Sequence, residues 1–259
     1  MKDFNWIKGN AFCHRGLHDN KSIPENSLPA FEKAKQLGLG YEYDVYLTLD
    51  GKLIVHHDYN LKRSCNLPDK TTRIDTSRLD SYKLMGTPHR IPLFDEVLEL
   101  TAGDVGMIIE IKPAARSRVE EVCRAVYDRL KDYNGNYCIE SFDNRIVDWW
   151  VSNHPEVITG QLYDPIFLHT GALKLMKQYR NVDFLALRVD QTRKPYFTSI
   201  KSKHQDKLIV AWTVRTPAQL DIARRYADTI IFEHSDKNDG YISIDDALSF
   251  TDKSNTPLS

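Results

Sequence analysis

Short apolar runs along the chain alternate with segments in which apolar residues recur at helical spacing. The pattern predicts strands over residues 11–14, 107–112, 137–142, 157–162, 184–189, 208–214 and 229–233, together with a hairpin over 41–58. It predicts helices over residues 27–37, 94–100, 117–133, 144–153, 170–179, 195–203, 217–226 and 244–250. Asn26 is the predicted N-cap of the first helix, and Gly38 follows its end.

The predicted hairpin reads YEYDVYLTLDGKLIVHHD and contains two acids at i and i+2, Glu42 and Asp44. This spacing places both side chains on one face of a strand. Asp50-Gly51 is typical of a two-residue hairpin loop, and counting outward from it pairs Asp44 with His57. The pattern therefore predicts two carboxylates and an imidazole at one place.

When the return arm of the hairpin is not counted, the chain has eight predicted strands, and each is followed by a predicted helix. This alternation favours a (β/α)8 barrel. An open doubly wound sheet is the main competitor, but the chain has no glycine-rich dinucleotide fingerprint. Residues 59–92 are polar and contain Pro68, Pro88 and Pro92, so we expect an irregular excursion within a single domain spanning residues 1–259. Residues 251–259 are predicted to be disordered.

Charge and composition exclude several classes of partner. The 35 basic and 36 acidic residues give a net charge of -1, so nothing draws the whole chain to nucleic acid or to an acidic membrane surface. The sequence has no apolar run of about 18 residues and no signal-peptide pattern, which argues against a membrane span. None of the four cysteines forms a CxxC pair, and the predicted location is the cytoplasm.

In a barrel of this kind the functional groups lie at the carboxyl ends of the strands. The first three predicted strands and the hairpin's return arm carry seven such groups: His14, Arg15, Glu42, Asp44, His57, Glu110 and Lys112. Three carboxylates can hold Mg²⁺ or Ca²⁺, a guanidinium and an ammonium can bind phosphate, and two imidazoles can exchange protons. Each residue taken singly also fits a structural role, with Arg15 paired to Glu42 or Glu110, Lys112 at the barrel rim and His14 in the core.

The motifs around these residues resemble those of the glycerophosphodiester phosphodiesterase family. The resemblance covers most of residues 11–233 and rests on His14-Arg15-Gly16, Pro24-Glu25-Asn26-Ser27, Glu42-x-Asp44-Val45, Thr48-x-Asp50-Gly51, His57-Asp58, Ile91-Pro92, Glu110-x-Lys112, Ser141-Phe142 and Trp212-Thr213-Val214.

The resemblance implies a TIM barrel with a bound divalent cation, Mg²⁺ or Ca²⁺. It implies metal ligands Glu42, Asp44 and Glu110, an acid–base pair His14 and His57, and phosphate contacts Arg15 and Lys112. It also brings Glu25, Asn26 and Trp212 near the substrate. The implied substrate is a small glycerophosphodiester whose free glycerol hydroxyl attacks phosphorus, giving a cyclic phosphate that water opens to glycerol phosphate.

The chain departs from the family pattern at two strand ends. Arg215 stands where the family has Asn, and Glu233 stands where it has Asp. We predict that the two form an ion pair across neighbouring strands; the alternatives are that Arg215 binds an anionic head group, or that the two charges ignore each other. Both departures concern substrate choice.

Two other functions compete with hydrolysis of glycerophosphodiesters. One is a related barrel phosphodiesterase that acts on a lysophospholipid or sphingolipid in the manner of a phospholipase D. The other is a barrel that binds a phosphorylated ligand without turning it over. The sequence contains no apolar or aromatic membrane-contact loop to favour the first, and the complete set of acids and histidines argues against the second.

Overall fold

The computed structural model describes residues 2–113, 115–164, 181–195, 198, 202, 205–235 and 239–250. The chain forms two compact units, one of residues 15–137 and one of residues 1–14 together with 138–259. The predicted helix over 170–179, most of the predicted helix over 195–203 and the predicted disordered tail over 251–259 lie outside the described residues.

The unit of residues 15–137 is built around β2 (Gly40–Leu47), which lies between β4 (Met107–Ile111) and the short strand β3 (Leu53–Val55). β2 and β4 run parallel, whereas β3 returns antiparallel to β2. Outside residues 59–92 the unit has four helical segments: α1 (Leu28–Gln36), α3 (Phe94–Thr101), η4 (Arg116–Arg118) and α4 (Val119–Leu130).

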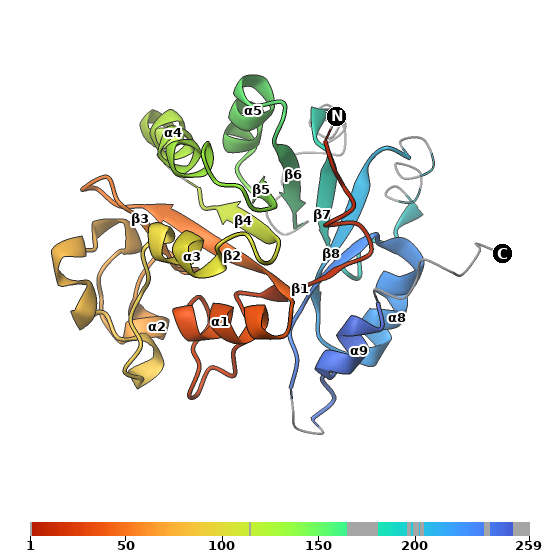
Figure 1. Cartoon of the computed structure of the whole chain (residues 1–259), viewed down its shortest axis with the longest axis horizontal. Coiled ribbons are helices and arrows are strands. Elements are labelled where there is room, and N and C mark those ends of the chain that lie inside the picture. The colour runs from red at the N-terminus through yellow and green to blue at the C-terminus, as the bar shows by residue number, and fades with distance from the viewer. Residues whose placement is uncertain are drawn as a thin grey trace. The chain divides into compact units, whose positions relative to one another are not determined.

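Strand β2 is buried on both of its faces. Figure 1 shows α1 and α3 beside this strand. Tyr41 stacks on Phe31 of α1 at 4.7 Å, and the Tyr43 ring lies 6.1 Å from Phe94 of α3. Because side chains alternate along a strand, Glu42 and Asp44 lie on the opposite face. They are buried as well, so this strand has no solvent-facing side.

The predicted hairpin is present, but its predicted register was wrong by one residue. Val45 pairs with Val55, and Leu47 with Leu53. The loop has three residues because Thr48 bonds to Lys52 through backbone and hydroxyl, while Gly51 adopts a φ of +76° at the loop end. The residue across from Asp44 is therefore His56, whose N–H donates to the Asp44 carbonyl at 3.0 Å.

The N-terminus of α1 also differs from its prediction. The N-cap is Ser27, whereas Asn26 lies one residue earlier with a φ of +53°. The Asn26 amide does not cap the helix, because it donates to the Asp44 carboxylate at 2.7 Å. Asn26, which was predicted to cap the start of α1, thus holds the Asp44 side chain of β2 instead.

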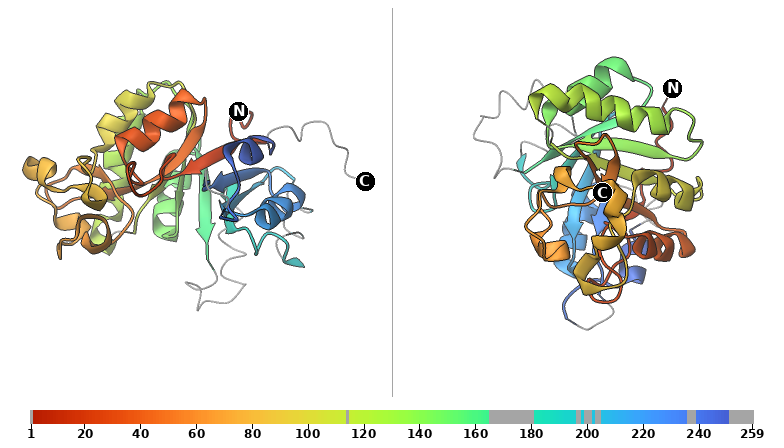
Figure 2. Two further views of the ribbon diagram at one scale, coloured as in Figure 1. Left: turned by 90° about the horizontal axis from the view of Figure 1, so that it is seen from below. Right: turned by 90° about the vertical axis from the view of Figure 1, so that its left-hand side faces the viewer.

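Residues 59–92 contain four short helical segments: α2 (Lys62–Cys65), η1 (Thr71–Arg73), η2 (Thr76–Ser81) and η3 (Leu84–Gly86). Their apolar side chains form a small core with Tyr46 and Ile54 of the hairpin; its other members are Leu61, Ile74, Leu79, Tyr82, Leu84 and Ile91. Figure 1 and Figure 2 show this segment, in orange and yellow, beside the ends of β2 and β3. The predicted excursion is therefore packed onto the hairpin by its own apolar residues.

The second unit contains a parallel sheet in the order β1-β9-β8-β7-β6-β5. Its strands are β1 (Ala11–His14), β5 (Tyr137–Ser141), β6 (Ile158–Tyr163), β7 (Phe184–Arg188), β8 (Leu208–Val214) and β9 (Thr229–Phe232). The described helices are α5 (Asn144–Asn153), α8 (Pro217–Tyr226) and α9 (Ile244–Leu248). Val147 of α5 packs on Leu185, Leu187 and Ile209 of the sheet.

Across the described residues, eight strands run parallel to a neighbour and β3 runs antiparallel. These are the strands of a (β/α)8 barrel with one added strand, as the alternation in the sequence predicts. No helix in the described part of the chain is long and apolar enough to cross a membrane.

Candidate functional site

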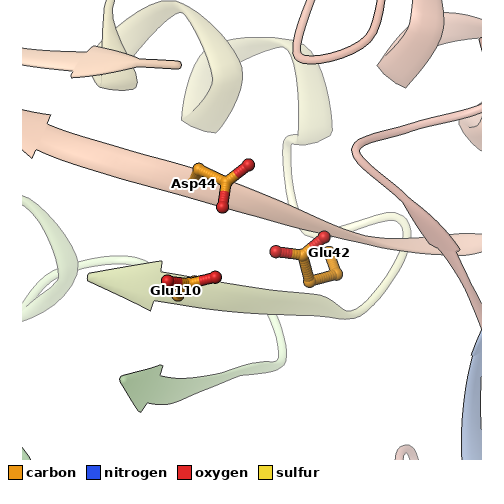
Figure 3. A group of neighbouring side chains, drawn as sticks. All are labelled: Glu42, Asp44 and Glu110. Atoms are coloured by element: carbon orange, nitrogen blue, oxygen red, sulfur yellow. The ribbon is translucent and has the colours of Figure 1, made fainter. Parts of the chain in front are cut away.

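Three buried carboxylates converge within the unit of residues 15–137. Glu42 and Asp44 share one face of β2, and Glu110 of β4 is the register partner of Asp44. One carboxylate oxygen from each residue lies within 4.8 Å of the others, and Figure 3 shows the three groups turned toward one another. All three are buried, so they form a set of hard oxygen ligands that could hold a divalent cation.

Two cations offset the charge of these acids. Lys112 follows β4 directly, and its Nζ lies 2.6 Å from Asp44 Oδ1 and 2.7 Å from Glu110 Oε1. Arg15 approaches from the loop before α1, with its Nε 3.3 Å from Asp44 Oδ2. Both residues therefore contact side chains that were predicted to be metal ligands.

The two acids that Lys112 contacts have pKa values shifted in opposite directions. Burial alone would raise the pKa of Asp44, but the charges of Lys112, His57 and Arg15 outweigh it and hold that pKa well below its usual range. Burial raises the pKa of Glu110, aided by the charge of Asp44 and opposed by Lys112. Asp44 is thus the more strongly ionised of these two acids.

Gly16 keeps the Arg15 loop close to α1. Its φ is +78°, and a Cβ at this position would come within 2.8 Å of the Ala30 side chain and 2.9 Å of the Ala30 backbone. The loop also places the Arg15 backbone N–H 3.2 Å from Glu42 Oε2. Only glycine fits this approach without displacing the arginine.

Glu25 and His57 belong to one chain of ion pairs. Arg15 Nη1 donates to Glu25 at 2.8 Å, and Arg63 of α2 donates to both oxygens of Glu25 at 3.0 and 2.7 Å. Arg63 also bonds to Asp58, which contacts His57 Nδ1 at 2.7 Å. These cations lower the pKa of Glu25 to about 2 despite its burial. This series of ion pairs thus connects Arg15, a predicted phosphate ligand, to His57, a predicted acid–base residue.

Arg63 is a site residue that the sequence analysis did not identify. It lies five residues after Asp58 in a polar segment with no periodic pattern, and that spacing has no structural meaning outside a helix or strand. Its role becomes visible only when α2 folds back over the His57 turn.

The adjacent histidines have different roles. His56 is buried, with its Nε2 2.7 Å from the Ser64 hydroxyl and its Nδ1 3.0 Å from the Asp58 carbonyl. Burial lowers the pKa of His56 to about 4, so the ring is neutral near pH 7. His57 is partly exposed, and its charge acts on both Asp44 and Glu110. That His57 takes part in acid–base chemistry beside the three carboxylates stays a prediction, and the hairpin register on which it was based is not the one observed.

The remaining predicted residues lie at strand ends of the second unit. Arg215 and Glu233 form the predicted ion pair through two hydrogen bonds, Nε to Oε2 at 2.7 Å and Nη2 to Oε1 at 2.8 Å. His14 Nδ1 lies 2.6 Å from the same Glu233 Oε1. The Trp212 ring meets Phe142 edge-on at 5.7 Å. That His14 flanks the three carboxylates stays a prediction.

Known proteins resemble this chain in two ways: some match part of its sequence, and some solved structures match most of its fold. A glycerophosphodiester phosphodiesterase of Caldanaerobacter subterraneus is 38% identical over 114 residues, which are 41% of this chain and 45% of that protein. The matching stretch thus spans less than half of that relative. The solved glycerophosphodiester phosphodiesterase of Thermotoga maritima is 27% identical with a TM-score of 0.70, covering 86% of this chain and 93% of the other.

An Oleispira antarctica phosphodiesterase, solved with the product sn-glycerol-3-phosphate, is 20% identical with a TM-score of 0.75 and covers 90% of this chain and 95% of the other. These likenesses confirm the (β/α)8 barrel fold. The glycerophosphoryl diester phosphodiesterase family matches residues 14–237, which include every predicted metal ligand and both predicted acid–base histidines. The chain therefore belongs to the glycerophosphoryl diester phosphodiesterase family.

Proposed function

We propose that this protein hydrolyses small glycerophosphodiesters to glycerol phosphate and an alcohol, with the help of a divalent cation. The observation that carries the proposal is the buried set of Glu42, Asp44 and Glu110 with two cations against it, in a chain of this family. The bound product of the Oleispira antarctica relative supports the same class of substrate.

The three carboxylates fit a hard cation. Carboxylate oxygens are the ligands that Mg²⁺ and Ca²⁺ prefer, and three of them leave coordination positions for water and phosphate oxygens. We propose Mg²⁺ or Ca²⁺ as the ion. Bound there, it would stabilise the negative charge that develops on the phosphoryl oxygens.

Arg15 and Lys112 are the proposed phosphate ligands. Arg15 offers a planar fork of N–H donors and Lys112 a compact positive charge, and both are held beside the carboxylates by ion pairs. Glu25 is the acceptor that holds Arg15, and Asn26 holds Asp44, so we propose that these two shape the site rather than bind substrate directly.

His57 and His14 are the proposed acid–base pair. The carboxylate of Asp58 accepts from His57 Nδ1, which leaves Nε2 as the nitrogen that exchanges a proton with substrate. In the first step the glycerol hydroxyl loses its proton to one histidine and bonds to phosphorus. The bond from phosphorus to the alcohol oxygen breaks, and that oxygen takes a proton from the other histidine. Water then opens the cyclic phosphate, which restores both histidines.

The cytoplasm remains the proposed location. All four cysteines are free in the structure, which is the usual state of thiols in a reducing compartment. The nearly balanced charge gives no basis for proposing a nucleic-acid partner. The proposed partner is a small-molecule glycerophosphodiester, bound near Trp212 and the Arg215–Glu233 pair.

The direct test is incubation of the purified protein with glycerophosphocholine and with a lysophospholipid, each with Mg²⁺, Ca²⁺ or EDTA, with detection of released glycerol phosphate and free alcohol. We expect hydrolysis of glycerophosphocholine that EDTA abolishes. Turnover of the lysophospholipid alone would favour the lipid phosphodiesterase. Binding of glycerol phosphate without turnover of either diester would favour the non-catalytic barrel.

A further inference from the structure

Glu233 is shared by a histidine and an arginine at the carboxyl ends of three neighbouring strands. His14 ends β1, while Glu233 and Arg215 directly follow β9 and β8. One carboxylate oxygen, Oε1, lies 2.6 Å from His14 Nδ1 and 2.8 Å from Arg215 Nη2, and the other lies 2.7 Å from Arg215 Nε. Both oxygens of the carboxylate are thus engaged by named side chains.

The backbone on either side of this cluster is firmly held. The Arg215 N–H donates to Gln219 of α8 at 2.8 Å, and the Arg215 carbonyl accepts from Ile242 at 2.7 Å. The Glu233 N–H donates to the Val214 carbonyl at 3.1 Å, which continues the pairing of β8 with β9. The two side chains therefore project from backbone positions that hydrogen bonds fix.

An ionised carboxylate can only accept hydrogen bonds, so the contact places the proton of a neutral His14 on Nδ1. The lone pair is then on Nε2, which becomes the nitrogen that takes or gives the catalytic proton. The Asp58–His57 contact has the same consequence for the other histidine.

Arg215 keeps Glu233 in the form that this role needs. Burial would raise the pKa of Glu233, but hydrogen bonds and charge from His14 and Arg215 outweigh it and hold that pKa far below its usual range. A carboxylate held in this way does not take the proton of His14 and remains an acceptor. Because the guanidinium also balances its charge, the imidazole is oriented without facing an unpaired negative charge.

We propose that Glu233 and Arg215 are positioning residues that set the tautomer and orientation of His14 during diester hydrolysis. The role in hydrolysis rests on the proposed function. The assignment also gives a use to the two positions at which this chain departs from its family. It favours Arg215 as part of the acid–base apparatus over Arg215 as a ligand for an anionic head group.

Kinetics separate the two roles for Arg215. We expect Glu233→Gln and Arg215→Gln each to lower kcat by roughly 10-fold or more with KM nearly unchanged, since the wrong tautomer affects the chemical step. The loss should be equal for neutral, cationic and anionic head groups. In a His14→Ala background Glu233→Gln should cost nothing further, because residues that act as a unit are not additive. A raised KM confined to anionic head groups would instead make Arg215 a substrate ligand and overturn the assignment.

The chain offers a matched control in Arg118 and Glu121, whose two hydrogen bonds have the same Nε and Nη2 geometry at 2.7 and 2.8 Å. Glu121→Gln removes an ion pair of the same geometry at a half-exposed glutamate of α4 and should leave kcat unchanged. A similar loss of kcat in this variant would show that the effect of Glu233→Gln is a general consequence of breaking an ion pair.

A second measurement does not depend on activity. In protein labelled with ¹⁵N-histidine, NMR should show His14 as the Nδ1–H tautomer in the wild type and altered ring nitrogen shifts in Glu233→Gln. An Nε2–H tautomer in the wild type, or shifts that the substitution leaves unmoved, would overturn the positioning role. If the wild type hydrolyses no diester but shows this tautomer, the proposed function fails while the contact between Glu233 and His14 stands.

Discussion

Replacing Lys112 by Met tests whether this ammonium is what makes the buried acid set tolerable without a metal. Lys112 Nζ lies 2.6 Å from Asp44 and 2.7 Å from Glu110, and all three residues are buried. Methionine keeps much of the volume of the side chain and removes the charge. The two carboxylates then lose a shared partner in a site that water does not reach freely.

The folded protein can respond to the lost charge in two ways, and the less costly one sets the loss of stability. Leaving a buried charge without its partner costs about 3 to 5 kcal/mol. Alternatively one carboxyl takes up a proton, which for an ordinary Glu pKa of 4.5 costs about 3 kcal/mol at about pH 7. Because the pKa of Glu110 is already raised, protonation is the cheaper route. We therefore expect a loss of about 3 kcal/mol at about pH 7, shrinking to about 1 kcal/mol at about pH 5.

The assay is urea unfolding followed by tryptophan fluorescence, in EDTA and in saturating Mg²⁺ or Ca²⁺. A cation that binds only the folded state at about 100 times its Kd adds about 2.7 kcal/mol. We expect the ion to stabilise Lys112→Met more than the wild type, because in the wild type the ammonium already offsets these carboxylates.

Lys207→Met is the matched control, since Lys207 is also buried and its Nζ donates to the Val182 carbonyl at 2.5 Å. Its response to metal should equal that of the wild type. A Lys112→Met deficit below about 1 kcal/mol in EDTA would refute the reasoning, given the 3 to 5 kcal/mol expected for a broken buried pair. So would a deficit that the metal leaves unchanged.

Three further changes test other parts of the site. Asp44→Asn should weaken Mg²⁺ or Ca²⁺ binding by at least about 100-fold in isothermal titration calorimetry, and unchanged binding would remove Asp44 from the ligand set. His57→Ala should lower kcat by about 100-fold or more, and near-normal turnover would contradict its acid–base role. The pKa of His56 is about 4 in the folded chain against an ordinary value of 6.5, so the unfolded chain binds more protons between these values and stability falls as the pH is lowered through this range. The loss from this residue should be about 2 kcal/mol between about pH 7.5 and about pH 5, and His56→Gln should lose that part of the pH dependence in urea unfolding; an unaltered pH slope would assign the effect to another group.

The sequence allowed the strands and the acid set to be predicted because those features depend on periodicity. Glu42 and Asp44 stand two apart, as do Glu110 and Lys112, and a period of two fixes a shared face whatever the exact strand ends. The (β/α)8 barrel followed from the alternation of strands and helices for the same reason. The ion pair of Arg215 and Glu233 was predictable because both directly follow strands of one parallel sheet.

What could not be predicted depends on single hydrogen bonds in irregular segments. The hairpin register turned on the Thr48 hydroxyl, which lengthens the loop by one residue. The N-cap was misplaced because Asn26 bonds to Asp44, a partner 18 residues away. Arg63 was missed because its partners meet it only after α2 folds. No local pattern encodes these contacts.

The burial of β2 on both faces bears on how this chain can change in length. Tyrosines on one face pack under α1 and α3, while the acids on the other form the site. Inserting or deleting one residue within β2 would exchange the faces, bringing aromatic rings into the site and carboxylates beneath the helices. Length variation during evolution should therefore collect elsewhere, for example at exposed turns of the 59–92 segment. Because its length should stay constant, β2 is a suitable reference segment for aligning this chain with distant relatives.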